Sequence, residues 1–369
     1  MTRSDDTLQQ LIAITLIPGI GHTNAKKLLA WVDEPAVIFR ESRSTLLKIP
    51  GLARILSSGI NLSDLLHRAE EEMVFIRNGG IKVFYFYDDN YPGRLKQCVD
   101  SPLLLYFKGS ECLFHKRMLA VVGTRHASSY GKKVCEEVIS DFRNDDMLII
   151  SGMAYGIDSC AHRSALVQGM DTLGVMAHGL DRIYPGANRN LARRMLGQGG
   201  LITEFLSGTI PDRENFPKRN RIIAGLADAV VVVESAAKGG AVITANIANS
   251  YNRDVFAVPG RTSDELSDGC HLLIRRHIAA LARSADDIRY SMGWEGKAEK
   301  KASSKALLEG FSPEEKKILG IIIDKEQASL DEILIISGLG ASKSAAILLK
   351  LEFERVISGL PGKMYALRK

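Results

Sequence analysis

The sequence predicts an α/β protein built on a doubly wound parallel sheet, with a helical domain before it and a small domain after it. Between residues 111 and 290, six apolar runs rich in β-branched residues alternate with helical patterns and Gly- or Pro-marked turns. Near-continuous apolar strands of this kind are typical of parallel sheets covered on both faces. The six runs are residues 119–122, 147–150, 172–176, 201–205, 229–234 and 255–258.

Four stretches follow one another along the 369 residues. Residues 1–110 are mainly helical and end in an aromatic run, 82–87, that predicts a short strand. Residues 111–290 carry the sheet, in an arrangement that is Rossmann-like but extended. Residues 291–306 are polar, Lys- and Ser-rich and without periodicity, which predicts a linker. Residues 307–369 predict helix, turn and helix with a wing over 359–367, a pattern that resembles a winged helix.

The composition excludes several classes of protein. Apolar residues make up 46% of the chain and charged residues 25%, which excludes wholesale disorder. No apolar run approaches the ~18–20 residues of a membrane-spanning helix, and the N-terminus has no secretory signal pattern. The five cysteines form no C-x-x-C pair, which argues against a disulfide framework or structural zinc. We therefore expect a cytoplasmic protein without a membrane partner, a metal or another cofactor.

The positive charge of the chain is concentrated in one place. The formal net charge is +5, and the forty residues from Arg182 to Arg221 hold eight basic and three acidic residues, an excess of five. Residues 1–100 hold 12 of each sign. A solvated helix and loop would explain such a run, but an anion-binding surface is the alternative that its position at a loop–helix junction favours.

The N-terminal stretch contains a helical hairpin signal. Pro18, Gly19 and Gly21 stand between two helical patterns, and a tight Gly-x-Gly turn presents backbone N–H groups at a helix start. The pattern resembles a helix-hairpin-helix (SAM-like) module, which contacts DNA backbone without sequence preference. A weaker copy lies at residues 48–53. A simple Pro-Gly corner explains the same residues, and the neutral charge of the region argues against tight DNA binding by it alone.

The loop after the first strand of the central sheet carries Gly123, Thr124 and Arg125. A mononucleotide fold binds phosphate at such a strand end, but the spacing is not G-x-G-x-x-G. The second strand ends in Ser151 and Gly152, with no acidic residue to hold a ribose, which disfavours a dinucleotide cofactor. Arg125 can instead fork onto phosphate oxygens or stack on a base.

Asp158 and His162 lie one helical turn apart in the next helix. Such a pair permits acid–base chemistry, although a structural pairing at a helix start is the commoner reading. The sequence offers no third member of a catalytic triad and no G-x-S-x-G elbow. We therefore expect no catalytic residues.

Aromatic and basic residues then occur together after the fourth strand. Phe216 is either a stacking platform for a base or a buried anchor of its loop, and the residues that follow it supply phosphate contacts. A further Gly-rich turn follows the fifth strand. The residues concerned are Lys218, Arg219, Asn220 and Arg221 beside Phe216, and Lys238, Gly239 and Gly240 in the turn.

Five sequence motifs follow one another between residues 123 and 260. They are G-T-R-x-x-S-x-Y-G (123–131), S-G-x-A-x-G-I-D-x-x-A-H (151–162), G-L-D-x-x-Y-P (179–185), F-P-K-R-N-R-I-I-A-G-L (216–226) and A-V-P-G (257–260). Together they resemble the DNA-processing protein family DprA, also called Smf. The resemblance implies a protein that binds and protects single-stranded DNA and loads a RecA-type recombinase in natural transformation and homologous recombination. It also implies a homodimer formed through the Rossmann-like domain.

Carried over residue by residue, the resemblance places the DNA pocket at Gly123, Thr124, Arg125, Ser151, Gly152, Phe216, Lys218, Arg219, Asn220 and Arg221, with Lys238, Gly239 and Gly240 beside them. The chain departs from the family at two places. Gly239-Gly240-Ala241 stands where the family usually has Ser-Gly-Ser, and His277-Ile278 stands where it usually has Gly-Ala, in a region that bears on dimerisation.

Two other functions remain open at this stage. Nucleotide N-glycosidases on a related Rossmann sheet carry a Gly-Gly-x-Gly-Thr loop followed by Glu, and this chain lacks the later glycine and the carboxylate after Gly239-Gly240. A duplex-binding regulator would read DNA through the C-terminal domain. That domain's second helix offers only Lys343 and Lys350 as basic side chains, which favours a protein contact over base readout.

Overall fold

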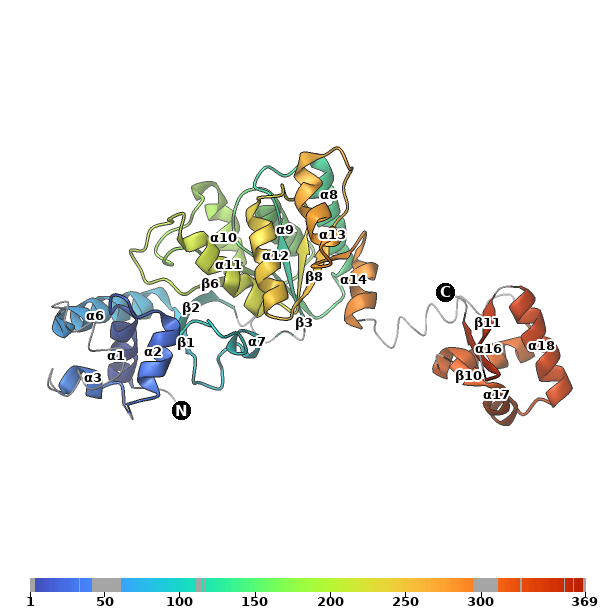
Figure 1. Cartoon of the computed structure of the whole chain (residues 1–369). Helices are drawn as coiled ribbons and strands as arrows, with labels where there is room; N and C mark the ends of the chain where they lie inside the picture. The colour runs from blue at the N-terminus through green and yellow to red at the C-terminus, as the bar shows by residue number, and fades with distance from the viewer. Residues whose placement is uncertain are drawn as a thin grey trace. The chain divides into compact units, whose positions relative to one another are not determined.

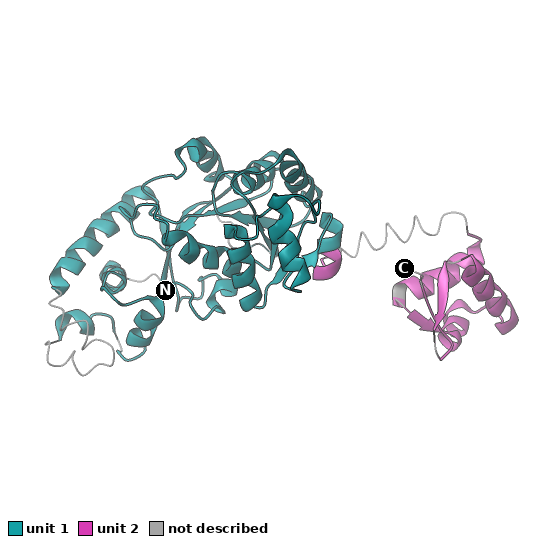
Figure 2. Cartoon of the chain, turned by 45° about the horizontal axis from the view of Figure 1, so that its top comes forward, with its two compact units in different colours: residues 1–288 teal, residues 289–369 magenta. Residues whose placement is uncertain are grey.

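The computed structural model describes residues 4–32, 34–41, 61–110, 115, 117–294, 311–325, 327–354, 356–360 and 362–367. The chain forms two compact units, Met1–Ile288 and Arg289–Lys369 (Figure 2). The second hairpin signal, at residues 48–53, and most of the predicted linker, at 291–306, lie outside the described residues.

A nine-stranded sheet forms the centre of the first unit in the described part of the chain, in the order β1-β2-β6-β5-β4-β3-β7-β8-β9. Strands β3 to β9 run parallel, while β1 and β2 pair antiparallel at one edge. The predicted parallel sheet is therefore confirmed. Its strands are β1 Lys82–Tyr85, β2 Leu104–Gly109, β3 Arg117–Val122, β4 Met147–Ser151, β5 Thr172–Val175, β6 Gly199–Thr203, β7 Ala229–Val232, β8 Asp254–Ala257 and β9 Ala280–Leu281.

Helices connect the parallel strands and pack over the sheet (Figure 1). Helix α8 packs beside α9, and α11 packs beside α12, as a doubly wound arrangement requires. The connecting helices are α8 Ser129–Asp141, α9 Ile157–Val167, α10 Arg189–Met195, α11 Asn215–Leu226, α12 Gly240–Ser250, α13 Asp268–Arg275 and α14 Ala285–Met292. The chain moves outward from β3 to β6 and then returns to place β7 on the other side of β3, so β3 and β7 meet at the switch point of the sheet.

The N-terminal helices share a core with the edge of this sheet. Helices α1 Asp5–Thr15, α2 His22–Leu29, α3 Val37–Arg40 and α6 Leu62–Gly79 precede β1, and α7 Gly93–Lys96 lies between β1 and β2. Leu11, Leu28 and Met73 of these helices cluster with Leu104 and Tyr106 of β2. The two strands before residue 110, which the sequence assigns to the helical domain, thus belong to the large sheet, because β2 pairs with β6.

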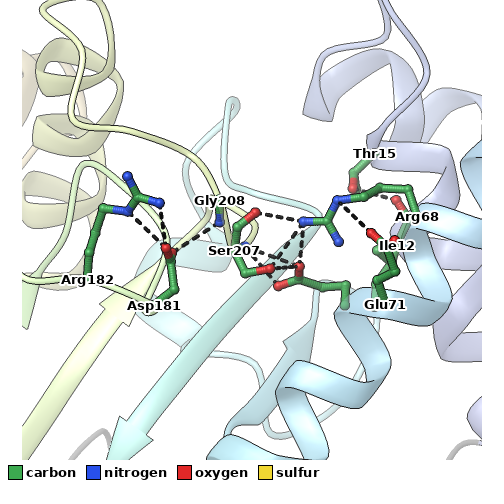
Figure 3. A network of polar contacts seen from close by, with 9 residues as sticks. Ile12, Thr15, Arg68, Glu71, Asp181, Arg182, Ser207 and Gly208 are labelled. Carbon is green, nitrogen blue, oxygen red and sulfur yellow. Dashed lines mark hydrogen bonds and ion pairs between the residues drawn. The ribbon is translucent and has the colours of Figure 1, made fainter.

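Polar contacts also tie α6 to the loop after β6 (Figure 3). The Arg68 guanidinium donates to the Ser207 carbonyl at 2.7 Å and pairs with Glu72 at 2.9 Å. The Ser207 amide donates to the Glu72 carboxylate at 3.0 Å, and the Gly208 amide donates to Asp181 at 3.1 Å. Glu72 is buried, so its charge is compensated by these donors.

The second unit has the winged-helix arrangement that the sequence predicts. It consists of α16 Pro313–Lys325, β10 Gln327–Ser329, α17 Leu330–Ser337, α18 Ala341–Phe353, β11 Ile357–Leu360 and β12 Met364–Leu367, and its small sheet has the order β10-β12-β11. Ile318, Ile322, Ile333, Leu348 and Leu351 form its own core. Strands β11 and β12 make the predicted wing.

No single helix among the described residues is long and apolar enough to cross a membrane, although the bent pair α17–α18 passes that test on length and composition. Within the same residues, no three His, Cys, Asp or Glu side chains are grouped to hold a metal ion.

Candidate nucleic-acid interface

A hollow of about 670 Å³, here called the central hollow, opens where β3 and β7 end. Ligands of open α/β sheets bind at such a switch point, outside the carboxyl ends of the strands. The loops after β3 and β7 and the starts of α11 and α12 surround it. Its lining includes Gly123, Thr124, Arg125, His126, Asp158, Tyr184, Arg213, Phe216, Arg219, Asn220, Ser235, Gly239, Gly240, Ile243 and Thr244.

An arginine and two aromatic rings form one wall of the central hollow. The Arg125 guanidinium lies over the Phe216 ring, 5.0 Å from its centroid. The Tyr184 ring lies 6.3 Å from the Phe216 ring, centroid to centroid, and Tyr184 is 47% exposed. Arg125 is also exposed. A half-buried ring with a cation on its face and a second ring beside it offers a base both a stacking surface and a phosphate contact.

Close backbone contacts fix the position of the loop that carries Arg125. The Thr124 amide donates to the Glu234 carbonyl at 2.7 Å, and the Ile157 amide donates to the Thr124 carbonyl at 3.1 Å. A Cβ at Gly123 would lie 2.5 Å from the Ile157 side chain, so only glycine lets β3, β7 and α9 approach this closely. The three elements therefore hold Arg125 at the rim of the hollow.

Glu234, at the end of β7, supports the same loop and is not available to a ligand. Its side chain is buried and accepts hydrogen bonds from the Ser128 amide at 2.9 Å and from the Ser128 hydroxyl. Ser128 also caps α8 by accepting from the Gly131 amide at 3.0 Å. The carboxylate thus fixes the start of α8 behind the hollow.

Arg219 lies beneath the hollow and is only 4% exposed. Its guanidinium donates to the Val175 carbonyl at 2.6 Å, to the Gly152 carbonyl and to the Asn220 side-chain oxygen at 3.0 Å. Burial, opposed by the charge of Asp158, lowers the pKa of Arg219 to about 10. Arg219 therefore joins α11 to the ends of β4 and β5. The central carbon of its guanidinium also lies 5.9 Å from the centroid of the Phe216 ring.

Asp158 and His162 do not pair with each other. His162 is fully buried and its Nδ1 lies 2.7 Å from the Thr172 hydroxyl, while Asp158 accepts from the Ala154 amide at 3.3 Å. Burial, and then the charge of Arg219, lowers the pKa of His162 to about 3. Burial raises the pKa of Asp158 against the opposing charge of Arg219. This arrangement is typical of a packed interior and contains no acid–base pair open to a substrate.

The basic residues of α11 face two different hollows. Phe216, Arg219 and Asn220 line the central hollow, whereas Lys218 and Arg221 line a second one of about 440 Å³, here called the side hollow. Arg221 donates to Glu204 and to the Asp100 carbonyl. Glu204 also contacts the His22 ring, at 2.5 Å, in the first turn of α2. The N-terminal hairpin thus meets the far side of α11.

Three of the sequence-predicted residues lie outside both hollows. Ser151 is buried and donates to the Val121 carbonyl at 2.7 Å. Gly152 is buried, and a Cβ there would lie 2.4 Å from the Arg219 guanidinium. Lys238 is exposed in the turn before α12.

Gly239 and Gly240 line the central hollow at the start of α12. A Cβ at Gly239 would lie 2.2 Å from the Ser235 hydroxyl. Ser235 and Thr244 also line the hollow, and their hydroxyls donate to the Ala236 and Gly240 carbonyls at 3.0 and 3.3 Å. Tyr184, Ser235 and Thr244 were not singled out as site residues from the sequence. Tyr184 belongs to the G-L-D-x-x-Y-P motif, and this motif could have identified it as a site residue from the sequence.

Comparison with known proteins gives a consistent result across most of the chain. A family model described as DNA recombination-mediator protein A matches residues 82–293, and one described as DprA winged helix domain matches 299–363. DNA processing protein DprA of Streptococcus pneumoniae is 42% identical over 205 residues, which cover 56% of this chain and 72% of that protein. Protein Smf of Escherichia coli is 31% identical over 289 residues, covering 76% of this chain and 75% of that protein.

Solved structures agree with the sequence matches. The X-ray structure of S. pneumoniae DprA superposes with a TM-score of 0.63 at 34% identity, covering 78% of this chain and 98% of that one. DNA processing protein A from Helicobacter pylori, whose structure is described as giving insight into a unique single-stranded DNA binding mode, superposes with a TM-score of 0.53 at 25% identity. That match covers 57% of this chain and 95% of the other.

Proposed function

Because the chain belongs to the DNA recombination-mediator protein A family, also called DprA or Smf, we propose that it binds single-stranded DNA in the central hollow. The wall formed by Arg125 and Phe216 at the β3–β7 switch point is the observation that carries the proposal. A base stacks beside Phe216 and Tyr184, and Arg125 binds an adjacent phosphate. The single-stranded DNA binding mode described for the H. pylori relative supports this assignment.

The proposed contacts imply little sequence preference, since every base has a π-face and every nucleotide a phosphate. Arg125, Arg213 and Lys218 are exposed cations on or beside the hollow. Arg219 acts from beneath the surface and orients Phe216 and Asn220. The start of α12 at Gly240 offers backbone N–H groups to a phosphate, whereas the Gly239 amide already donates to the Ala236 carbonyl at 2.8 Å.

Further parts of the proposal follow from family membership. The protein protects incoming single strands and loads a RecA-type recombinase onto them in natural transformation and homologous recombination. It acts as a homodimer through the Rossmann-like domain, in the cytoplasm, where four buried free cysteines suit a reducing compartment. It is not an enzyme, because the buried Glu234 and Asp158 are engaged within the protein. Release of free base from AMP by the purified protein would contradict this last point.

The proposal is tested by the anisotropy of a labelled oligothymidylate at two salt concentrations. Arg125→Ala should weaken binding about tenfold or more and reduce the dependence of log K on log salt by about 0.7, the contribution of one phosphate contact on a single strand. Phe216→Ala should weaken binding by a similar factor, about 1–3 kcal/mol per stacked base, and leave the salt slope unchanged.

Arg143→Ala is the matched control, because Arg143 is exposed between α8 and the start of β4, at the amino ends of the parallel strands, whereas the hollow lies at their carboxyl ends. It should bind as the unchanged protein does. Unchanged affinity in Arg125→Ala, or equal losses in Arg125→Ala and Arg143→Ala, would reject the central hollow as the binding site.

A further inference from the structure

Helix α10 carries three exposed arginines on one side, here called the arginine face: Arg189, Arg193 and Arg194. Its other side is buried in an apolar cluster through Leu191 and Met195. Among the residues that the structure describes, none of the three guanidinium groups has a hydrogen-bonding or ion-pair partner. Residues 182–203 contain no aspartate or glutamate, so the chain near α10 supplies no local counter-charge.

Within the protein alone, the charges of the arginine face are unfavourable. Arg189 is the first residue of α10, where the helix dipole favours an acidic side chain. Arg189 and Arg193 lie one turn apart, and like charges at this spacing destabilise a helix. The elements that pack most closely on α10 are η1 Gly186–Asn188, α9, β5 and β6, and the acidic residue they contain, Asp158, is buried. An anion bound to the arginine face would relieve this repulsion.

The surface between the arginine face and the central hollow is open. Tyr184, whose ring belongs to the wall of the hollow, precedes Arg189 by five residues. Their Cα atoms are therefore at most ~17 Å apart, and closer here because η1 is helical. Gly186 and Ala187, between them, are exposed, and a Cβ at Gly186 would meet nothing within 4 Å. No large side chain stands on this short path.

The start of α10 is also fixed to the loop that borders the hollow. Asn188 is buried, and its side-chain amide donates to the Met153 carbonyl at 2.9 Å. Ala154, the next residue, lines the central hollow. The arginine face is thus held at a constant place relative to the hollow.

We propose that the arginine face binds phosphates of the DNA strand that leaves the central hollow past Tyr184. The inference rests on the proposed function, because it concerns the continuation of the same strand. A guanidinium forks onto phosphate oxygens, and one helical turn, about 6 Å along the axis, separates Arg189 from Arg193. Helix α10 has no aromatic residue, so it binds the backbone and stacks no base. Affinity should therefore grow with the length of the strand and not with its sequence.

Anisotropy with two labelled oligothymidylates tests the inference, one of about 5 nucleotides that fills the hollow and one of about 25 that reaches α10. Arg193→Glu should weaken binding of the long strand about tenfold, reduce its salt slope by about 0.7 or more, and leave the short strand unaffected. Arg143→Glu is the control, because it changes the net charge equally at an exposed position on the opposite side of the sheet. It should bind both strands as the unchanged protein does.

Arg189→Glu separates a binding role from a structural one. It removes the like-charge pair with Arg193 and places an acid at the start of α10, so the midpoint of thermal unfolding should stay the same or rise. Binding of the long strand should nevertheless fall about tenfold. A lower midpoint together with equal losses for both strands would mean that Arg189 supports the fold, which would overturn the inference.

The failure of this inference differs from a failure of the central hollow. If Arg189→Glu and Arg193→Glu bind the long strand normally while Arg125→Ala loses affinity for both strands, the path along α10 is wrong and the hollow stands. If Arg125→Ala binds the short strand normally, the hollow is wrong and the path falls with it. Equal losses in Arg143→Glu, or losses seen with duplex DNA and not with single strands, would also overturn the inference.

Discussion

Arg125 and Arg219 both approach the face of Phe216, yet their surroundings give them different roles. Arg125 is exposed at the end of β3, while Arg219 is 4% exposed and donates to two carbonyls at the ends of β4 and β5. The sequence shows Arg125 in the loop after the first strand and Arg219 in the basic run 182–221, and it does not tell which of the two is buried. The difference arises because β4 and β5 end beneath α11, a long-range contact that no local pattern contains.

Arg219→Ala should therefore mainly lower the stability of the protein. Removing the guanidinium leaves the Gly152 and Val175 carbonyls without this donor and Asp158 without its compensating charge, which should lower the free energy of unfolding by about 3–5 kcal/mol. Chemical denaturation measures this directly. Arg125→Ala serves as the comparison and should change stability by no more than about 0.5 kcal/mol. If Arg219→Ala unfolds like the unchanged protein and loses only DNA affinity, Arg219 contacts DNA itself.

The backbone conformation of His277, one of the two positions where the sequence departs from the expected pattern, is also a feature of a single residue. His277 lies just beyond α13 and has φ of +55°, in the left-handed region. That conformation after a helix favours glycine, which is the residue that the resemblance led us to expect there. This chain therefore holds a histidine in a backbone conformation that favours glycine.

At the scale of elements, α9 and α11 set the geometry of the central hollow. Helix α11 divides its residues between two hollows because positions three or four apart share a helix face. Phe216, Arg219 and Asn220 therefore lie on one face, and Lys218 and Arg221 lie on another. Gly156 is the N-cap of helix α9, and the loop that carries Arg125 packs against it. A Cβ at Gly156 would lie 2.1 Å from the Thr124 carbonyl, and its φ is +75°.

Gly156→Ala should lower both stability and single-strand affinity, because the added methyl group displaces the loop that carries Arg125. Gly169→Ala, at the other end of α9, is its control. Gly169 has φ of +74° and open space around it, so alanine there adds only backbone strain of about 1 kcal/mol. Denaturation should show a larger loss for Gly156→Ala, and anisotropy should show a binding loss for that variant alone. Equal effects of the two variants would mean that the Thr124 contact does not position Arg125.

At the scale of the whole molecule, the sequence predicted the parallel strands of the sheet but not the two antiparallel strands that extend it. Each of the six apolar runs became a strand, because a strand buried on both faces needs a continuous apolar segment. The addition of β1 and β2 was not foreseen, since β1 joins the sheet through β2, and the pairing of β2 with β6 joins residues about a hundred positions apart. The Gly123–Arg125 loop and Phe216 lie together because parallel strands all have their carboxyl ends on the same side of the sheet, where the loops that follow them meet. Neither local pattern contains this contact.

The separate cores of the two units lead to a prediction for the whole chain. Ile322 is fully buried in the core of the C-terminal unit, and Leu173 is fully buried in the core of the large sheet. Calorimetry should show two unfolding transitions, as expected for independent domains. Ile322→Ala should destabilise only the C-terminal transition, by about 2–5 kcal/mol, and leave single-strand affinity unchanged, since the hollow lies entirely in the first unit. Leu173→Ala should lower the other transition by a similar amount. If either substitution moved both transitions together, the units would unfold as one body and the winged helix would contribute to the stability of the DNA site.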